Sequence, residues 1–340
     1  MSSDVLVSGG ALLSHSDAPA VSLHADARRQ MMLGIETELA ALRQLDTGIR
    51  IREMSLFIGL WVAGMLINAY GYRAAPGLLP TLVRIAGTVM TAVAINTFIL
   101  FLHEGMHKTL FASPQLNRWV SVSLGVVFCL SFSAYKVMHQ RHHQYLGDER
   151  DPDDYSNYTK NRLLLWFLHY VRLIAGVYIY IVMIPVLASR KGSPADRRDI
   201  LVEYGVLAAV YAVVFTLVPG GYLLYLWFIP LVMAAHMTAI RGLTQHGITE
   251  AHDPYLASRS IQAHPVVAFC LLQENYHLEH HLFPEIPSYH LAEVHKLIWP
   301  RLPRVVTGRS YLAFLFKFFA ATLRMDDRPI GFIEMIGWEV

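Results

Sequence analysis

The residues of this sequence best suited to chemistry are its histidines, which gather in three short clusters. Seventeen histidines occur among 340 residues. The clusters read His103-Glu104-Gly105-Met106-His107, His139-Gln140-Arg141-His142-His143 and His277-Leu278-Glu279-His280-His281. Residues three or four apart share one face of a helix, so each cluster directs two or three imidazoles the same way. Neutral imidazole is a good ligand for iron, copper, nickel or zinc, and the clusters therefore predict a metal site.

The number of imidazoles indicates two metal ions. One metal with an open position for a reactant uses three or four protein ligands, so eight clustered histidines imply a pair. His246 ends an apolar segment before the third cluster and is the expected ninth ligand. His236 lies deeper in that segment, and both a ligand role and a packing role stay open for it. The predicted ligands are His103, His107, His139, His142, His143, His246, His277, His280 and His281.

The composition predicts that these clusters are held by membrane helices. The chain is 54% hydrophobic and only 16% charged, which is the balance of a membrane protein. Its net charge of +2 offers no basic excess for binding nucleic acid. Cys129 and Cys270 both lie in apolar stretches, so we interpret them as packing residues and not as a disulfide or a thiolate metal site.

Six apolar segments could position the clusters, and four of them are expected to cross. A crossing needs about 20 mostly apolar residues in helical conformation. The first two and last two segments meet this, and Pro219-Gly220-Gly221 makes the last two a helical hairpin. The third is short and the fourth starts near His169 and Arg172, so either could lie in the interface or dip in and return. The segments are residues 54–70, 85–102, 119–134, 173–189, 204–218 and 222–240.

Basic residues flank the apolar segments on one side, which predicts the orientation. The opposite loops hold only Arg73. The positive-inside rule then places both termini and the long polar segments in the cytosol. An even number of crossings between successive clusters would bring all three clusters to that same face. We therefore expect an all-α integral membrane protein with about four transmembrane helices, interfacial helices and a cytosolic histidine-rich metal-binding cap. The flanking basic residues are Arg50, Arg52, Lys108, Arg118, Arg190, Lys191, Arg197, Arg198 and Arg241.

Three regions are expected along the chain. Residues 1–49 lack a basic start followed by an apolar core, so we interpret them as a mostly mobile cytosolic tail and not as a signal peptide. Within this tail, helix propensity indicates a short helix at Glu36 to Arg43. Residues 50–304 form the membrane domain. Residues 305–340 form an interfacial and cytosolic tail, in which the apolar run 311–321 is expected to lie on the membrane.

As a set, the three clusters resemble the histidine boxes of the membrane fatty acid desaturase and hydroxylase superfamily. The run Asn-Tyr-His-Leu-Glu-His-His-Leu-Phe-Pro-Glu-Ile-Pro at 275–287 extends beyond the histidines and resembles acyl-lipid desaturases in particular. The resemblance covers roughly residues 57–302. It implies that the nine histidines hold two irons at the cytosolic membrane surface, that O2 is the oxidant, and that hydrogen is removed from a methylene of an acyl chain. The implied reaction is most simply the introduction of a C=C bond.

The resemblance also implies partners. No side chain can abstract hydrogen from an alkyl chain, so the metal must supply that chemistry. Electrons must come from a separate carrier of the ferredoxin, rubredoxin or cytochrome b5 type, because the chain shows no nucleotide fingerprint, flavin motif, cysteine cluster or fused haem domain. The substrate is expected to be a lipid or acyl chain from the bilayer. We predict no substrate-binding residues, because aromatic residues such as Trp166, Tyr178 and Trp227 are expected to pack or to lie at the interface.

Carboxylates near an all-imidazole site would orient the rings by accepting their second N–H. The histidines outside the clusters are expected to be surface or hydrogen-bonded residues, although His290 and His295 could support the third cluster. Most of the run 148–154 is expected to be a solvated loop. The candidate carboxylates are Glu104, Asp148, Glu149, Asp151, Asp153 and Glu279.

Three other functions each fit part of the sequence. The first cluster is also an H-E-x-x-H motif, in which Glu104 could be the general base of a membrane zinc metalloprotease, but this leaves the other two clusters unexplained. A metal transporter would carry ionisable groups through its spans, whereas here they gather at helix ends. A lipid or carotenoid hydroxylase or ketolase starts with the same hydrogen abstraction, and only the continuation His-His-Leu-Phe-Pro-Glu-Ile-Pro favours a desaturase.

Overall fold

The structure is a computed structural model that describes residues 18–335. It is mainly helical, with three short strands in its second half. The elements that matter below are α1 (Ala18–Met32), α2 (Glu36–Leu42), α3 (Thr47–Arg73), α4 (Leu78–His107), α5 (Pro114–Val127), α6 (Phe132–Tyr145), α7 (Arg162–Lys191), α8 (Pro194–Leu217), α9 (Gly220–Tyr222), a π-helical turn (Leu223–Phe228), α10 (Ile229–His246), β1 (Arg259–Ile261), α11 (Pro265–Cys270), α12 (His277–Leu282), α13 (Leu291–Ile298), β2 (Arg304–Gly308), α14 (Tyr311–Arg324) and β3 (Phe332–Glu334).

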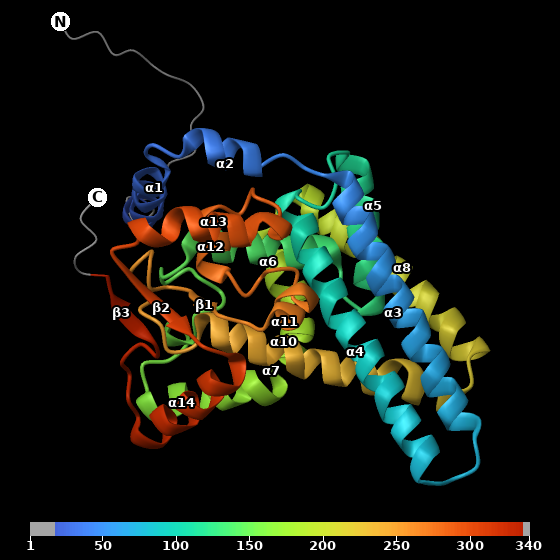
Figure 1. Cartoon of the computed structure of the whole chain (residues 1–340). Coiled ribbons are helices and arrows are strands. Elements are labelled where there is room, and N and C mark those ends of the chain that lie inside the picture. The colour runs from blue at the N-terminus through green and yellow to red at the C-terminus, as the bar shows by residue number, and fades with distance from the viewer. Residues whose placement is uncertain (1–17, 336–340) are drawn as a thin grey trace, which may run out of the picture.

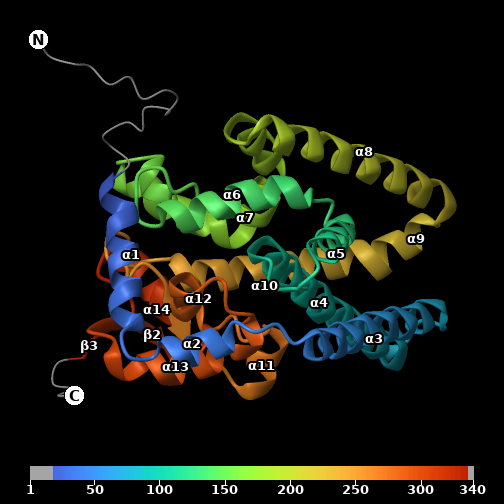
Figure 2. The ribbon, with the colours of Figure 1, turned by 90° about the horizontal axis from the view of Figure 1, so that it is seen from above.

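Long apolar helices extend to one side of a cap of shorter elements (Figure 1). Seen from above, α3 and α8 lie on opposite sides of this bundle with α10 between them (Figure 2). Within residues 18–335, five helices are long and apolar enough to cross a membrane: α3, α4, α7, α8 and the continuous run from Gly220 to His246. The expected all-α membrane fold is confirmed. Helix α7 passes this test by length and composition, and its segment is one of the two that were expected to lie in the interface or to dip in and return.

Helices α3 and α4 form a tight antiparallel hairpin. A Cβ atom built on Gly87 would lie 2.5 Å from the backbone nitrogen of Asn68 and 2.7 Å from the carbonyl oxygen of Gly64. The two backbones can approach this closely only because neither glycine has a side chain, which is a common way to join helices in lipid. This contact fixes the end of α4 that carries His103 and His107.

Helices α5 and α6 dip toward the bundle and return. They meet at an angle of 103°. At the start of α5, Asn117 donates a hydrogen bond to the carbonyl of Gly105 on the last turn of α4 (2.8 Å). At its end, Tyr211 of α8 donates to the carbonyl of Val126 (2.6 Å), far along the bundle. Since Lys136 on α6 pairs with Asp196 at the start of α8 (3.5 Å), α6 comes back to the cap. The first two histidine clusters therefore lie at the same end of the bundle.

The cap joins both ends of the described chain to the third cluster. Strand β1 pairs in parallel with β2, and β2 pairs antiparallel with β3. Leu39 of α2 is fully buried in one apolar cluster with residues of α12, α13 and β2. Helices α1 and α2 lie within the segment 1–49, where we expected a mostly mobile tail with a short helix at residues 36–43, and residues 1–17 lie outside the described residues. The boundary that we expected between the membrane domain and the C-terminal tail, after residue 304, falls within β2. This strand shares a sheet with β1, which belongs to the expected membrane domain.

Arg259 on β1 ties the cap to the end of α10. Its side chain is completely buried, and it donates to the carbonyls of Thr244, Gly247 (3.0 Å), Ile248 (2.9 Å) and Ile330 (3.0 Å). Burial lowers its pKa to about 9, so the guanidinium stays charged at neutral pH. These carbonyls include those left open at a helix C-terminus, where a cation is favourable. The contact holds His246, the last residue of α10, in a fixed position.

Helix α14 is amphipathic in the structure. Phe314 and Phe318 are buried against the protein, whereas Leu312, Phe316 and Leu323 are exposed. An exposed apolar face on a helix beside membrane spans is typical of an interfacial helix. The position of this helix on the membrane stays a prediction.

Candidate metal centre

Four helices deliver the predicted ligands to one place. His103 and His107 occupy the last turns of α4, which ends at Lys108 in the left-handed conformation (φ 64°). Ser131 caps the start of α6, because its hydroxyl accepts a hydrogen bond from the backbone N–H of Ala134 and so fixes the helix that carries the second cluster. The remaining ligands come from the end of α10 and from the short helix α12.

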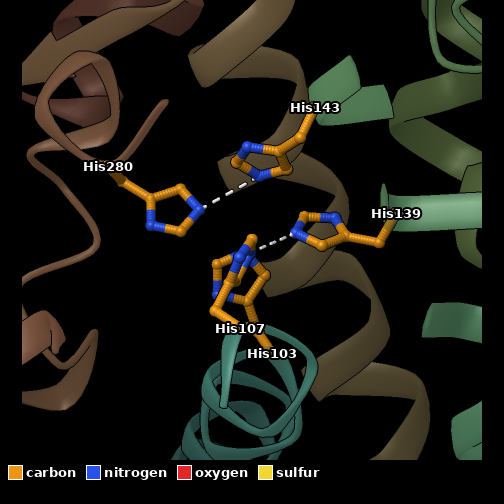
Figure 3. Close-up of side chains that lie close together, drawn as sticks. All are labelled: His103, His107, His139, His143 and His280. Atoms are coloured by element: carbon orange, nitrogen blue, oxygen red, sulfur yellow. Dashed lines mark hydrogen bonds between the residues drawn. The ribbon is translucent and has the colours of Figure 1, made fainter. Parts of the chain in front are cut away.

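Five imidazoles form the first group of candidate ligands (Figure 3). Their candidate ligand nitrogens all lie within 4.8 Å of one another. The Nε2 atoms of His107 and His139 are 2.8 Å apart, and those of His143 and His280 are 3.2 Å apart. Two imidazole nitrogens at about 2.1 Å from one ion and at right angles are separated by about 3.0 Å, so these distances fit a shared ion. The group consists of His103, His107, His139, His143 and His280.

A second group lies directly beside the first. It contains His142, His246 and His281, again with ligand nitrogens within 4.8 Å. His277 adjoins it, since its Nε2 is 2.9 Å from that of His246 and 3.2 Å from that of His281. The stacked rings of His143 and His281, with centroids 4.2 Å apart, connect the two groups.

All nine predicted histidines are therefore brought together, as a group of five and a group of four. Their role as ligands stays a prediction. His236 lies apart from them, because its Nδ1 bonds to the carbonyl of Val232 (2.8 Å) and it belongs to neither group. Nine imidazole nitrogen donors in two adjacent sets suit two borderline transition-metal ions.

Glu274 is a functional candidate that the sequence analysis missed. It is completely buried, and its carboxylate lies 3.5 Å from Nδ1 of His103, 3.4 Å from Nδ1 of His277 and 3.6 Å from Nδ1 of His280. Its oxygens make no shorter hydrogen bond to any residue the structure describes. A carboxylate facing Nδ1 favours the tautomer whose Nε2 is free to bind metal. Because His277 belongs to the second group and the other two to the first, Glu274 serves both.

A signal for Glu274 was present in the sequence. It stands three positions before His277 and is the only carboxylate between residues 254 and 278. The predicted supporting carboxylates came only from inside the clusters and from the run 148–154. A single carboxylate in a stretch of low polarity, directly before a histidine cluster, indicates a buried group with a specific partner.

The charge states match metal binding. Burial by itself would raise the pKa of Glu274, but the neighbouring His280 and His103 hold it well below its ordinary value, so the group is a carboxylate. Burial lowers the pKa of His277 to about 4 and holds the pKa values of His280 and His281 well below the usual range. The three imidazoles are therefore neutral at pH 7, with lone pairs available to a metal.

Two of the predicted carboxylates do support the site. Asp151 Oδ1 lies 2.9 Å from Nδ1 of His142 and both groups are buried, so Asp151 orients a ligand of the second group although most of its neighbours form the expected loop. Glu279 accepts hydrogen bonds from His295 and from the hydroxyl of Ser260. It thus anchors α12 to α13 and β1, which gives His295 the supporting role that the sequence left open.

The other predicted carboxylates do not contact a ligand nitrogen closely. Asp148 pairs with Arg150, Glu149 is exposed, and Asp153 Oδ2 lies 3.8 Å from Nδ1 of His142. Glu104 is buried, and although its carboxylate could join His103 and Glu274 in a third possible cation site, it is already bound to Arg50 and to the backbone N–H of Ser288 (3.1 Å). Glu104 therefore joins α4 to α3 and to the segment after α12.

The metal-free protein is expected to lose stability as the pH falls from about 6.5 to about 4. The pKa of His277 in the folded chain (about 4) lies below its ordinary value of 6.5, so the unfolded chain binds more protons in this window. Protonation then favours unfolding, by roughly 3 kcal/mol for this one group. Melting temperatures of chelator-treated protein in detergent between pH 7.5 and pH 4 test this, and a flat profile would contradict it.

Comparisons with known proteins agree with this geometry. The Fatty acid desaturase family matches residues 79–313. The sphingolipid delta(4)-desaturase DES1 of Gallus gallus is 24% identical over 318 residues, which cover 89% of this chain and 88% of the relative. The sphingolipid delta(4)-desaturase/C4-monooxygenase DES2 of Homo sapiens is 24% identical over 304 residues, with 86% of each chain covered. The matched region contains all nine clustered histidines and Glu274, and the chain belongs to the fatty acid desaturase family.

Proposed function

We propose that this chain is a membrane-bound oxidoreductase that introduces a C=C bond into the hydrocarbon chain of a lipid, with two irons held by the nine clustered histidines and O2 as the oxidant. The observation that carries the proposal is the gathering of nine buried or half-buried imidazoles into two adjacent groups, in a chain of the fatty acid desaturase family. Acid–base or nucleophilic chemistry by side chains cannot oxidise an alkyl chain.

The residues present fit a pair of irons. The donors are all imidazole nitrogens, which suit iron, and no carboxylate is needed in direct contact. Iron in this setting would supply the power to activate O2 and remove hydrogen from an unactivated carbon. The chain's own part is to hold imidazoles such as His277, His280 and His281 neutral. It also fixes imidazole tautomers through Glu274 and Asp151.

The proposal includes a separate electron carrier and a cytosolic active site. Forming one double bond removes two hydrogens from the lipid, and reducing O2 to two waters takes two further electrons. The basic residues around the spans support a cytosolic position for the cap, where a soluble or membrane-anchored carrier could reach it.

Hydroxylation of the same lipid is the second candidate. One relative is named a desaturase/C4-monooxygenase, and this name covers both desaturation and the addition of an oxygen. The two reactions share the first hydrogen removal and differ in the second step, which either removes another hydrogen or adds an oxygen. A metalloprotease is not supported, because Arg50 and the Ser288 backbone already occupy the Glu104 carboxylate that would have to act as a free base.

Expression in a yeast or bacterial host that lacks its own desaturases tests the proposal. Mass spectrometry of total lipids should reveal a new species two mass units lighter than its precursor, and protein purified without added metal should contain about two irons per chain. A product heavier by one oxygen would establish the hydroxylase instead. Zinc in place of iron, with lipids unchanged, would refute the proposal.

A further inference from the structure

A third set of side chains next to the two histidine groups could also hold a cation. It consists of His103, Glu104 and Glu274, whose candidate ligand atoms all lie within 4.8 Å of one another. None of the three side chains is more than about 5% exposed. Two donors on opposite sides of one ion are about 4.2 Å apart at a bond length of about 2.1 Å, so small shifts would let the three share an ion. Imidazole and carboxylate are both ligands of zinc, and this set therefore competes with the histidine groups.

An ion bound in this third set would disturb both histidine groups. His103 belongs to the group of five as well, and a neutral imidazole has one free lone pair, so it serves one ion at a time. Glu274 faces Nδ1 of His277 (3.4 Å) and of His280 (3.6 Å), and its oxygens make no shorter hydrogen bond to the described residues. A cation that drew this carboxylate away would remove the acceptor that orients these rings.

Arg50 already supplies a positive charge to this third set. Its guanidinium bonds to the carboxylate of Glu104 through one nitrogen and to that of Glu53 through another (3.0 Å). Arg50 and Glu104 are each only 1% exposed, so little water screens the charge between them. A divalent ion bound to Glu104 would lie beside the guanidinium, and two positive charges so close in a buried site repel each other strongly.

Contacts other than the one with Glu104 hold Arg50 in place. It lies in the first turn of α3, with its guanidinium 4.8 Å from the ring centre of Tyr289 and 5.7 Å from that of Phe101. The hydroxyl of Tyr289 accepts a hydrogen bond from the backbone N–H of Asp46, the residue that caps α3 (2.7 Å). The ion pair is thus part of the junction between the first span and the cap.

Stability alone does not account for a charge pair at this position. Replacing a buried ion pair by apolar side chains of similar volume is often neutral or stabilising, because both charges lose their water when they are buried. The other contact of the Glu104 carboxylate is the backbone N–H of Ser288 (3.1 Å), which a neutral amide oxygen could accept as well. The charge of Arg50 is instead placed to act on the neighbouring metal site.

From these contacts we infer that Arg50 is a specificity-determining residue for metal loading, whose charge keeps divalent cations out of the set formed by His103, Glu104 and Glu274 and so limits the chain to two ions. Arg50 bonds to none of the clustered histidines and acts through Glu104, so it is a positioning residue. The inference rests on the two-ion site of the proposed function and goes beyond it, because it states what sets the number of ions.

Zinc binding to the full chain in detergent tests the inference without turnover. After treatment with a chelator and reloading with zinc, native mass spectrometry should count two ions on the unmodified chain. Arg50→Gln keeps a hydrogen-bond donor for Glu104 but removes the charge, and it should bind a third ion. The group of five then keeps four imidazoles, which are enough for one ion. Arg52→Gln is the matched control with two ions, because Arg52 is an exposed residue of the same helix.

Two further variants separate the charge from the fold. The double variant Arg50→Met with Glu104→Met leaves no carboxylate at position 104, and should bind two ions and melt close to the unmodified chain. Arg50→Lys restores a positive charge and should also bind two. If Arg50→Gln folds only after zinc is added, the ion has replaced the missing charge and the inference is supported.

Two ions on Arg50→Gln, three ions on the double variant, or failure of Arg50→Gln to fold even with zinc would overturn the inference. These outcomes are distinct from failure of the proposed function. If the unmodified chain binds two ions and Arg50→Gln binds three, but no lipid is oxidised, only the proposed function fails. If lipid is oxidised and Arg50→Gln still binds two ions, only the inference about Arg50 fails.

Discussion

His280→Ala is expected to reduce lipid oxidation by more than about a hundredfold and to lower the metal content of the purified protein. His280 is only 1% exposed within the first histidine group, with its Nε2 3.2 Å from that of His143. Its loss would leave a gap that no neighbouring side chain fills. His142→Ala should act in the same way on the second group, where it also strands the buried carboxylate of Asp151. Lipid mass spectrometry and elemental analysis of the same preparations measure both effects.

The matched control for these variants is His252→Ala. His252 is exposed and belongs to neither histidine group, so iron content and product should stay at their normal levels. The assignment of ligands would be wrong if His280→Ala and His142→Ala behaved like this control. Melting temperatures of all three variants separate loss of metal from loss of the fold.

Eight of the nine histidines could be found from the sequence because each cluster carries its own geometry, and His246 followed from its place at the end of the apolar segment before the third cluster. Spacings of three and four residues align imidazoles on one helix face whatever surrounds the helix. The sequence also had to predict that the clusters lie at one end of the bundle. The number of apolar segments that cross between them was enough for that prediction. The dip of α5 and α6, with its 103° bend, was one of two arrangements allowed for the short third segment.

The features that the sequence did not reveal depend on contacts between distant segments. Strand β1 has three residues and pairs with β2 more than 40 positions later, so neither shows a pattern of its own. Helix propensity favours a helix at residues 36–43, but the packing of its Leu39 against α13 depends on contacts that no local preference predicts. Arg50 and Glu104 are 54 positions apart and meet only because α3 packs along α4. The role of Glu274 also depends on contacts between distant segments, because the folded cap places its carboxylate between three imidazoles from α4 and α12.

Glu274→Gln should lower activity about 10- to 100-fold and weaken metal binding in both histidine groups at once. The substitution keeps the shape of the side chain but removes its charge, and an amide has one oxygen where the carboxylate has two. Glu274 faces His103 and His280 of the first group and His277 of the second, so all three imidazoles lose the acceptor that fixes their tautomer. Carboxylates that orient metal-bound imidazoles typically contribute effects of this size.

The comparison with Asp151→Asn makes this prediction specific. Asp151 contacts only His142 among the clustered histidines, so its substitution should weaken one metal and spare the other. Iron retained per chain after graded dialysis against a chelator distinguishes the two variants: Glu274→Gln should release both irons together, and Asp151→Asn should release them in two separate steps. Glu149→Gln is the control, because Glu149 is an exposed carboxylate of the loop after α6. If Glu274→Gln released its irons in two steps, or kept both like the control, Glu274 would not be the link between the two sites, because its three contacts span both groups and its loss must reach each of them.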